Sequence, residues 1–110
     1  MPPASAAPVT TTRYVGVADW WGFHVRIEDG AARRALRYRG GAHLASFAWG
    51  RSGLAARELA RALIEDATGS SALAERHCRE MTHDLIADLP ALGFELTRED
   101  VLAWVAAASD

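Results

Sequence analysis

The chain has 110 residues, of which half are apolar and 24% are charged, a composition typical of one globular domain and not of a disordered or fibrous protein. The formal net charge of −2 excludes a polycation that binds nucleic acid through its overall charge, and no apolar run approaches the roughly 20 residues of a membrane-spanning helix. Cys78 is the single cysteine and cannot form an internal disulfide, so we expect a cytoplasmic protein that is not associated with membranes.

The first predicted elements are a leader and two strands. Residues 1–12 mix Pro, Ala, Ser and Thr without charge or helical period, so we expect a disordered leader before a single domain at residues 13–108. Alternation of apolar and polar residues predicts strands at residues 13–17 and 23–28. The side chains expected on the solvent face of the second strand are those of His24, Arg26 and Glu28.

A hairpin turn and a third strand follow. Asp29 and Gly30 are residue types that accept the positive φ of a two-residue turn. We therefore predict a third strand at residues 32–38, which Gly40-Gly41 ends, whereas residues 43–49 fit either a short strand or an irregular segment. Leu36 and Tyr38 are expected on one face of the third strand, and Arg33, Arg37 and Arg39 on the other.

The remainder of the chain has the apolar spacing of helices. Ser52 is expected to cap a first helix that runs to about Ala67. Either Ser70 or Ser71 is expected to cap a second helix, which Pro90 stops.

A brief extended stretch at residues 94–96 precedes the last helix. Thr97 and Asp100 have the spacing of a capping box and predict a third helix after them. Strands that precede helices in the chain indicate an α+β fold, with a small antiparallel sheet of three to four strands followed by three helices packed on one face.

The second predicted helix carries the one cluster of potential metal ligands. Glu80 and His83 have the Glu-x-x-His spacing of di-iron bundles, but no matching carboxylates are apparent on the other helices. His77 and His83 are six residues apart, which is not the spacing of a zinc protease. A solvated helix face is therefore expected, with Cys78 as an inert buried thiol. The full cluster is His77, Cys78, Glu80, His83 and Asp84.

Signatures of catalysis are also missing from the sequence. It contains no Gly-rich phosphate loop, no Gly-x-Ser-x-Gly elbow and no Cys-x-x-Cys pair. We therefore expect no enzyme activity, catalytic residue, metal or cofactor, and keep a metal-dependent enzyme on the second helix as an alternative.

The charges are distributed unevenly along the chain. All 12 basic residues are arginines; residues 1–61 carry a net charge of +5 and residues 62–110 a net charge of −7. The two halves present fields of opposite sign unless the fold places one charge cluster on the other. Seven arginines and one acid, Glu58, lie within residues 33–61, and Tyr38 and Trp49 lie among them. Arginines could follow phosphates while the rings stack on bases, so nucleic-acid binding by residues 33–61 is an alternative function.

The tryptophans suggest two different roles. Trp20 and Trp21 interrupt the first two strands as part of a turn. Adjacent residues of an extended segment point to opposite sides, so one ring could join the core while the other stays near the surface. A ring at the surface would be a contact residue, because aromatic residues are enriched at binding hot spots, but a loop that folds both rings inward is the commoner arrangement. Phe47 and Trp49 are two residues apart and face the same way in an extended segment, so we predict that both are wedged between the sheet and the first helix.

Several short motifs resemble an uncharacterised family of small domains found in bacteria, plasmids and phages. They are Arg13-Tyr14-Val15-Gly16, Phe47-Ala48-Trp49-Gly50, Leu59-Ala60 with Leu63, and Leu96-Thr97. The resemblance covers roughly residues 13–104. Where the family carries a Gly-Ser-Gly-Pro-like stretch, this chain has Gly53-Leu54-Ala55-Ala56, so a ligand site of backbone amides at the helix entry is not matched. The resemblance implies no activity, but it implies an accessory role on a mobile element, such as counter-defence.

The first functional hypothesis is a non-enzymatic protein-interaction module of unknown partner, encoded on a phage or mobile element as an inhibitor of host defence. The sequence leaves the oligomeric state open, a dimer included. The residues expected to contact a partner are Trp20, Trp21, Arg33, Arg37, Arg39 and Arg51.

Overall fold

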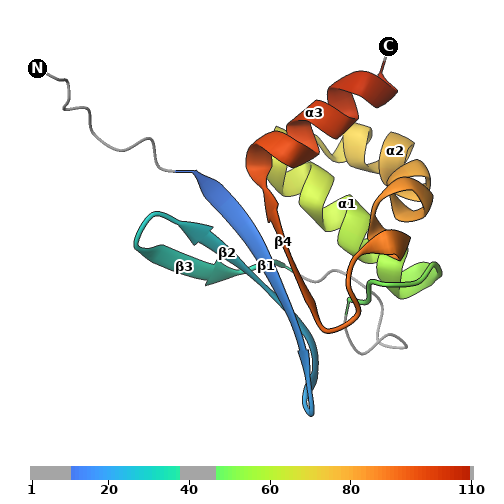
Figure 1. Ribbon diagram of the computed structural model, residues 1–110. Helices are drawn as coiled ribbons and strands as arrows, with labels where there is room; N and C mark the ends of the chain where they lie inside the picture. Colours follow the sequence, from blue (N-terminus) through green and yellow to red (C-terminus); the bar gives the residue numbers. More distant parts are fainter. Residues whose placement is uncertain (1–10, 38–46, 110) are drawn as a thin grey trace, which may run out of the picture.

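A computed structural model describes residues 11–37 and 47–109 (Figure 1). The elements in chain order are β1 (Thr12–Asp19), β2 (Gly22–Asp29), β3 (Ala32–Ala35), α1 (Leu54–Thr68), α2 (Ser71–Asp84), the short 3₁₀ helix η1 (Ile86–Asp88), β4 (Gly93–Thr97) and α3 (Arg98–Ala108). The strands form one antiparallel sheet in the order β3-β2-β1-β4, and the three α-helices lie on one side of it. The predicted α+β fold is confirmed.

The extended stretch near the end of the chain is the fourth strand of the sheet. β4 pairs with β1, so the first strand is central and the last one is an edge. Gly16 of β1 lies opposite Phe94 of β4, and a Cβ on Gly16 would lie 2.1 Å from the Phe94 ring. The phenylalanine ring therefore occupies the space that the glycine leaves free.

The core lies between the sheet and the helices, and Trp49 is at its centre. Only 2% of Trp49 is exposed, and its ring makes edge-to-face contacts with Phe23 and Phe94 at centroid distances of 4.7 and 4.9 Å. Leu59 and Leu63 of α1 are fully buried in the same cluster as Phe47. The prediction that Phe47 and Trp49 are core residues is confirmed.

A buried polar contact ties the central strand to α1. The Tyr14 hydroxyl donates to the Asp66 carboxylate at 2.8 Å, and Arg34 of β3 lies 3.1 Å from the other oxygen of that carboxylate. Burial, followed by the hydrogen bond to Asp66, raises the pKa of Tyr14 well above its ordinary value of 10. Tyr14 therefore stays protonated and anchors Asp66.

Helix capping agrees with the sequence at two of three helices. The Ser70 hydroxyl accepts the Leu73 N–H at 3.1 Å, and Thr97 and Asp100 form the predicted reciprocal capping box. The prediction for Ser52 is wrong, because α1 begins after Gly53, which has φ 119° and makes no side-chain cap. That backbone conformation suits glycine, so the helix starts one residue later than expected.

Two further boundaries differ from those predicted. α2 ends at Asp84 rather than at Pro90, because Leu85 leaves the helical conformation and η1 follows. This change allows the carbonyl of buried Ile86 to accept the Gly50 N–H at 2.9 Å. β3 ends at Ala35, and β1 begins at Thr12, within the expected leader. The predictions for Tyr38, Arg39, Gly40-Gly41, residues 43–46 and residues 1–10 lie outside the described residues.

Candidate functional site

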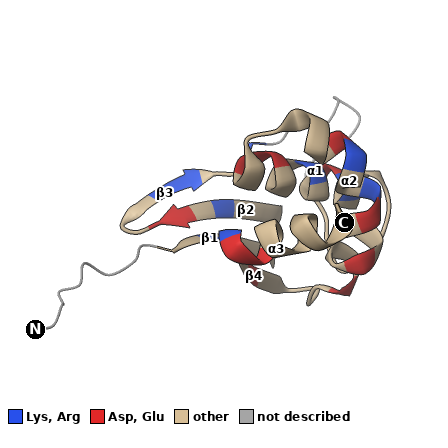
Figure 2. Cartoon of the chain, turned by 90° about the horizontal axis from the view of Figure 1, so that it is seen from above, with Lys and Arg blue, Asp and Glu red and all other residues tan. Residues whose placement is uncertain are grey.

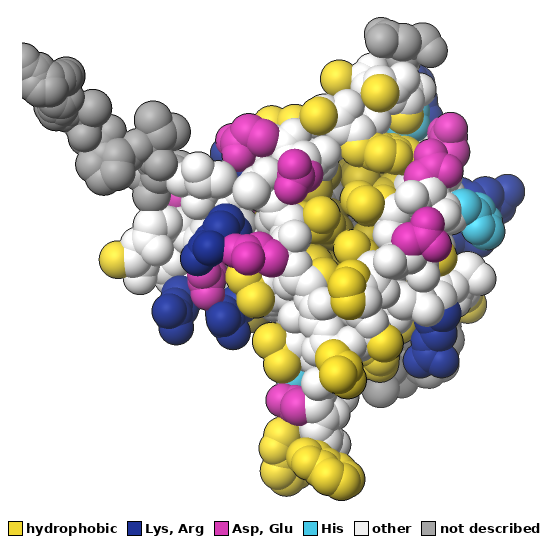
Figure 3. Space-filling view, viewed as in Figure 1, with side chains coloured by type: hydrophobic (Ala, Val, Ile, Leu, Met, Phe, Trp, Pro, Cys, Tyr) yellow, Lys and Arg dark blue, Asp and Glu magenta, His cyan; other side chains and the backbone are white. Residues whose placement is uncertain are grey.

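The end of the β1–β2 hairpin exposes two neighbouring tryptophans. Asp19 pairs with Gly22, so Trp20 and Trp21 form the whole connection between the strands. Trp20 is 99% exposed and Trp21 is 87% exposed. In Figure 3, hydrophobic side chains project at the bottom of the view, where Figure 1 places the end of this hairpin. The arrangement with both rings folded inward is therefore wrong for this chain.

Local hydrogen bonds hold the turn that carries these rings. The Asp19 carboxylate accepts the Trp21 N–H at 2.8 Å and lies 3.2 Å from Nε2 of His24. Gly22 takes a φ of 110°, and no residue other than glycine has a positive φ in the described part of the chain. The turn can place two bulky residues side by side because the glycine after them adopts the unusual conformation.

A third exposed apolar residue, Leu92, lies just before β4, beside the last residues of β1. The Ala18 N–H donates to the carbonyl of Leu92 at 3.0 Å, which places the Pro90–Leu92 turn next to the hairpin. Leu92 is 82% exposed. We call Trp20, Trp21 and Leu92 the tryptophan tip. Leu92 is not among the contact residues predicted from the sequence, although an apolar residue between turn-forming Pro90 and Gly93 is a signal of an exposed position.

The predicted arginine contacts lie on different elements. Arg51 is close to the tip, since its guanidinium carbon lies 5.9 Å from the centre of the Phe23 ring. Arg33 is at the other end of β2, opposite Glu28, roughly 20 Å along the strand from Trp21. Arg37 is exposed after β3, and Arg39 lies outside the described residues. The structure thus places Arg51 over Phe23, the second residue of β2, and Arg33 opposite the far end of that strand.

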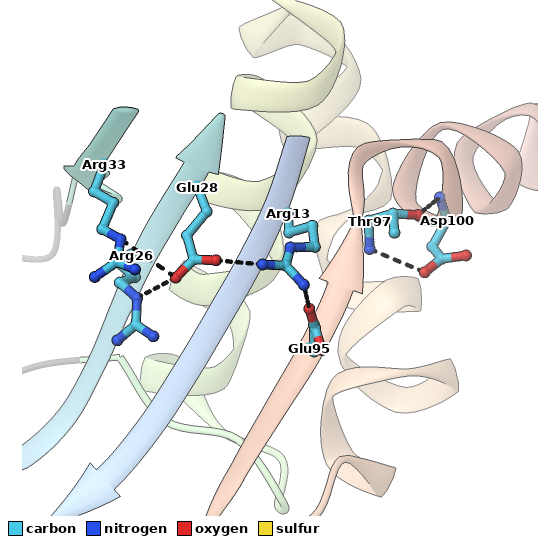
Figure 4. A network of polar contacts seen from close by, with 7 residues as sticks. All are labelled: Arg13, Arg26, Glu28, Arg33, Glu95, Thr97 and Asp100. Atoms are coloured by element: carbon cyan, nitrogen blue, oxygen red, sulfur yellow. Dashed lines mark hydrogen bonds and ion pairs between the residues drawn. The ribbon is translucent and has the colours of Figure 1, made fainter. Parts of the chain in front are cut away.

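A network of ion pairs covers the side of the sheet that faces away from the helices (Figure 4). Glu28 lies 2.7 Å from both Arg13 and Arg26 and 3.9 Å from Arg33, and Arg13 also pairs with Glu95. The prediction of a solvated Glu28 is wrong, because this carboxylate is buried beneath the arginines. Hydrogen bonds from Arg26 first and Arg13 second hold the pKa of Glu28 below its ordinary value, despite the opposing effect of burial.

The two oppositely charged halves of the sequence partly neutralise each other. Among the residues that the structure describes, three arginines of the basic half pair with acids of the acidic half. These ion pairs are Arg13–Glu95, Arg34–Asp66 and Arg61–Glu75. Of the two arrangements left open by the sequence, the fold therefore adopts the one in which the charge clusters meet.

The potential metal ligands of α2 point in different directions. Cys78 is buried as predicted, but His77 is also buried, where its Nε2 lies 3.3 Å from the Ser109 hydroxyl. Glu80 and His83 are exposed. Within residues 11–37 and 47–109, no three His, Cys, Asp or Glu side chains are placed to hold a metal ion. A fully solvated face is thus wrong at His77, which packs against Trp104 of α3.

Comparisons with known proteins give the family of the chain. No helix among the described residues has the length and apolar character needed to cross a membrane. Neither the curated proteins nor the solved structures contain a match to the chain. One family model matches residues 14–107, nearly the whole folded region. The chain belongs to the family of unknown function DUF6166, which agrees with the resemblance to an uncharacterised small-domain family.

Proposed function

We propose that the chain is a non-enzymatic protein-interaction module that contacts its partner through the tryptophan tip. The observation that carries this proposal is the nearly complete exposure of Trp20 and Trp21 on a turn held by hydrogen bonds. Water contact with large aromatic rings is unfavourable, and their burial against a partner recovers that free energy. Tryptophan is also among the residues most often found at binding hot spots.

The tip favours a partner with an apolar groove. Two adjacent indole rings and Leu92 provide the apolar contact, while Asp19 and Arg51 lie near it and can form polar contacts at the rim. A turn with a fixed backbone loses little conformational entropy on binding, which increases affinity. We extend the proposal to a cytoplasmic accessory protein of a phage or mobile element, where such a contact would inhibit a host defence protein.

The proposal is tested by affinity purification of partners with the full chain. Trp20→Ser together with Trp21→Ser should remove at least about 90% of the captured partner, because each lost hot spot costs about 2 kcal/mol or more. Leu54→Ser with Leu102→Ser is the matched control, since both leucines are exposed but lie on α1 and α3. The control should retain the partner.

Other outcomes identify a different role for the tip. A partner retained equally by both variants would contradict a contact through the tryptophans. Sedimentation of the purified chain measures its oligomeric state and so tests whether the partner is a second copy of the chain. Self-association through the tip would still be a protein contact and would support the proposal. Binding to lipid vesicles through the tryptophans, without any protein partner, would overturn the proposal.

A further inference from the structure

A second surface, separate from the tryptophan tip, lies between α1 and α2. It is a pocket of about 340 Å³. Its lining consists of Arg57, Arg61, Glu75, Arg76, Cys78 and Arg79. Two of the four arginines belong to the basic half of the sequence and two to the acidic half. The stretch of residues 33–61 therefore indicates only part of this cluster.

Helix geometry explains how two pairs of arginines come to line one pocket. Arg57 and Arg61 are four residues apart on α1, and Arg76 and Arg79 are three residues apart on α2, so each pair shares one helix face. Figure 2 shows basic residues on adjoining parts of the two helices. Both pairs are among the residues that line the pocket.

Most of the positive charge in this pocket has no carboxylate partner. Arg61 lies 2.9 Å from Glu75 and 3.6 Å from Glu58, yet its Nε atom is buried and lacks a hydrogen-bond partner in the described structure. Among the residues that the structure describes, no ion pair is formed by the other three arginines, which are Arg57, Arg76 and Arg79. Like charges held close together repel, so a bound anion would stabilise this arrangement.

The chemistry of the lining favours phosphate over other anions. A guanidinium group donates two parallel hydrogen bonds to phosphate oxygens, and a phosphoryl group brings up to two charges and three acceptor oxygens, where a carboxylate brings one charge. The pocket is at the small end of ligand sites, and no aromatic ring is among its described lining residues. The pocket would therefore recognise its ligand through contacts with the phosphate oxygens and not through stacking on a base.

We infer that the pocket between α1 and α2 binds two neighbouring phosphoryl groups, with Arg57, Arg61, Arg76 and Arg79 as donors. The phosphoryl groups belong either to a free oligophosphate or to consecutive phosphodiesters of a nucleic-acid backbone. Both offer non-bridging oxygens that accept guanidinium N–H groups, but each phosphodiester brings one charge and two such oxygens, whereas a terminal phosphoryl group brings up to two charges and three. This inference is independent of the proposed protein contact, because the tryptophan tip is on other elements and contributes nothing to the pocket.

The test is titration calorimetry of the full chain at low ionic strength with sodium pyrophosphate and, separately, with a short DNA duplex. Arg76→Gln with Arg79→Gln should weaken binding by about tenfold or more, because charge-assisted hydrogen bonds are lost. Arg33→Gln with Arg51→Gln is the matched control, since it removes the same charge from exposed positions outside the pocket. The control should bind within about twofold of the parent. Arg76 and Arg79 are exposed and form no ion pair with the residues that the structure describes, so the melting temperature of the pocket variant should stay unchanged. Melting temperatures of both variants are measured as the check on folding, because Arg33 lies 3.9 Å from Glu28 and Arg51 lies over the Phe23 ring.

The two ligands distinguish the source of the phosphate. If pyrophosphate binds and the binding needs Arg76 and Arg79, the ligand is a free oligophosphate. If only the duplex binds in a way that needs these arginines, the ligand is a nucleic-acid backbone. Failure of both ligands to bind overturns the inference. Equal weakening by the pocket variant and the control also overturns it, since that result reflects net charge. A glutamate-rich peptide that binds more tightly than either phosphate ligand would show that the pocket recognises carboxylates instead.

Discussion

The β1–β2 hairpin has one region that the rest of the molecule covers, its face toward the helices, and one that solvent surrounds, its far end. Toward the helices, the hairpin packs Tyr14, Phe23 and Ile27 against Trp49 and α1. At its far end, the same hairpin leaves Trp20 and Trp21 in solvent. Tryptophan thus has opposite environments at two places on one hairpin: Trp49 is buried against it, and Trp20 and Trp21 are exposed at its end. The role of each tryptophan therefore follows from its burial and not from its residue type. Buried Trp49 stabilises the fold, whereas exposed Trp20 and Trp21 are free to contact a partner.

The largest effect on stability is expected in the core, on the face of the hairpin that the helices cover. Trp49→Ala should lower the free energy of unfolding by about 3–5 kcal/mol, because it removes a fully buried ring and leaves a cavity. Small domains have roughly 5–15 kcal/mol in total, so the variant should be close to unfolding. Chemical denaturation followed by circular dichroism measures the loss. A loss under about 1 kcal/mol would place Trp49 outside the stabilising core and break the comparison.

A smaller loss is expected where the covered side is most tightly packed. Gly16→Ala should cost about 1–3 kcal/mol, because the added Cβ meets the buried ring of Phe94. Phe94→Leu in the same chain should relieve part of that clash, which a double-mutant cycle measures as a favourable coupling. Additive losses in the double variant would show that the glycine and the ring do not compete for space.

The open face of the sheet should respond to pH. The pKa of Glu28 is lower in the folded chain than its ordinary value of 4.5, so its contribution to stability is present above that pH and is lost as pH falls through the folded value. Glu28→Gln should therefore be less stable than the parent at neutral pH and approach it in acid. Denaturation midpoints at several pH values test this, and a difference independent of pH would contradict it.

The smallest effect on stability is expected at the tip. Trp20→Ala with Trp21→Ala should change the free energy of unfolding by less than about 0.5 kcal/mol, because neither ring has packing to lose. Denaturation under the conditions used for Trp49→Ala gives a direct comparison. Destabilisation above about 1 kcal/mol would mean that the rings support the hairpin, and the contrast between the two regions would fail.

Local patterns were sufficient to predict most of the elements. Alternation located β1 and β2, and the Thr97–Asp100 box fixed the start of α3, because these signals depend on neighbours in the chain. The partner of β4 could not be predicted, since a short extended stretch carries no information on which strand it joins. Glu28 was misassigned for a related reason: its polar character suggested solvent, whereas arginines from two other strands cover it.

The candidate sites were predictable only in part. The Trp20-Trp21 pair was visible in the sequence, but its orientation depends on Gly22 and on the neighbouring Pro90–Leu92 turn. The arginine pocket could not be predicted from the sequence, because its side chains come from two helices and local patterns do not show how those helices pack.

The residues that carry the family resemblance do not mark either candidate site. Tyr14, Gly16, Phe47 and Trp49 are all buried, and Gly50 adopts a positive φ beside the Leu89 carbonyl. They are buried or backbone-determining residues of the scaffold, so the resemblance concerns the scaffold and does not mark either candidate site.

The central position of β1 affects how the chain can fold during its synthesis. β1 is made first, but its neighbour β4 is completed only at Thr97. At roughly 5–20 residues per second, the ribosome needs roughly 4–16 s to make the intervening chain. During that interval β1 can pair with β2, while its other edge remains open to strands of a second nascent chain. The last strand therefore completes the sheet and, by its arrival, ends the period in which the chain is most prone to associate with its own copies.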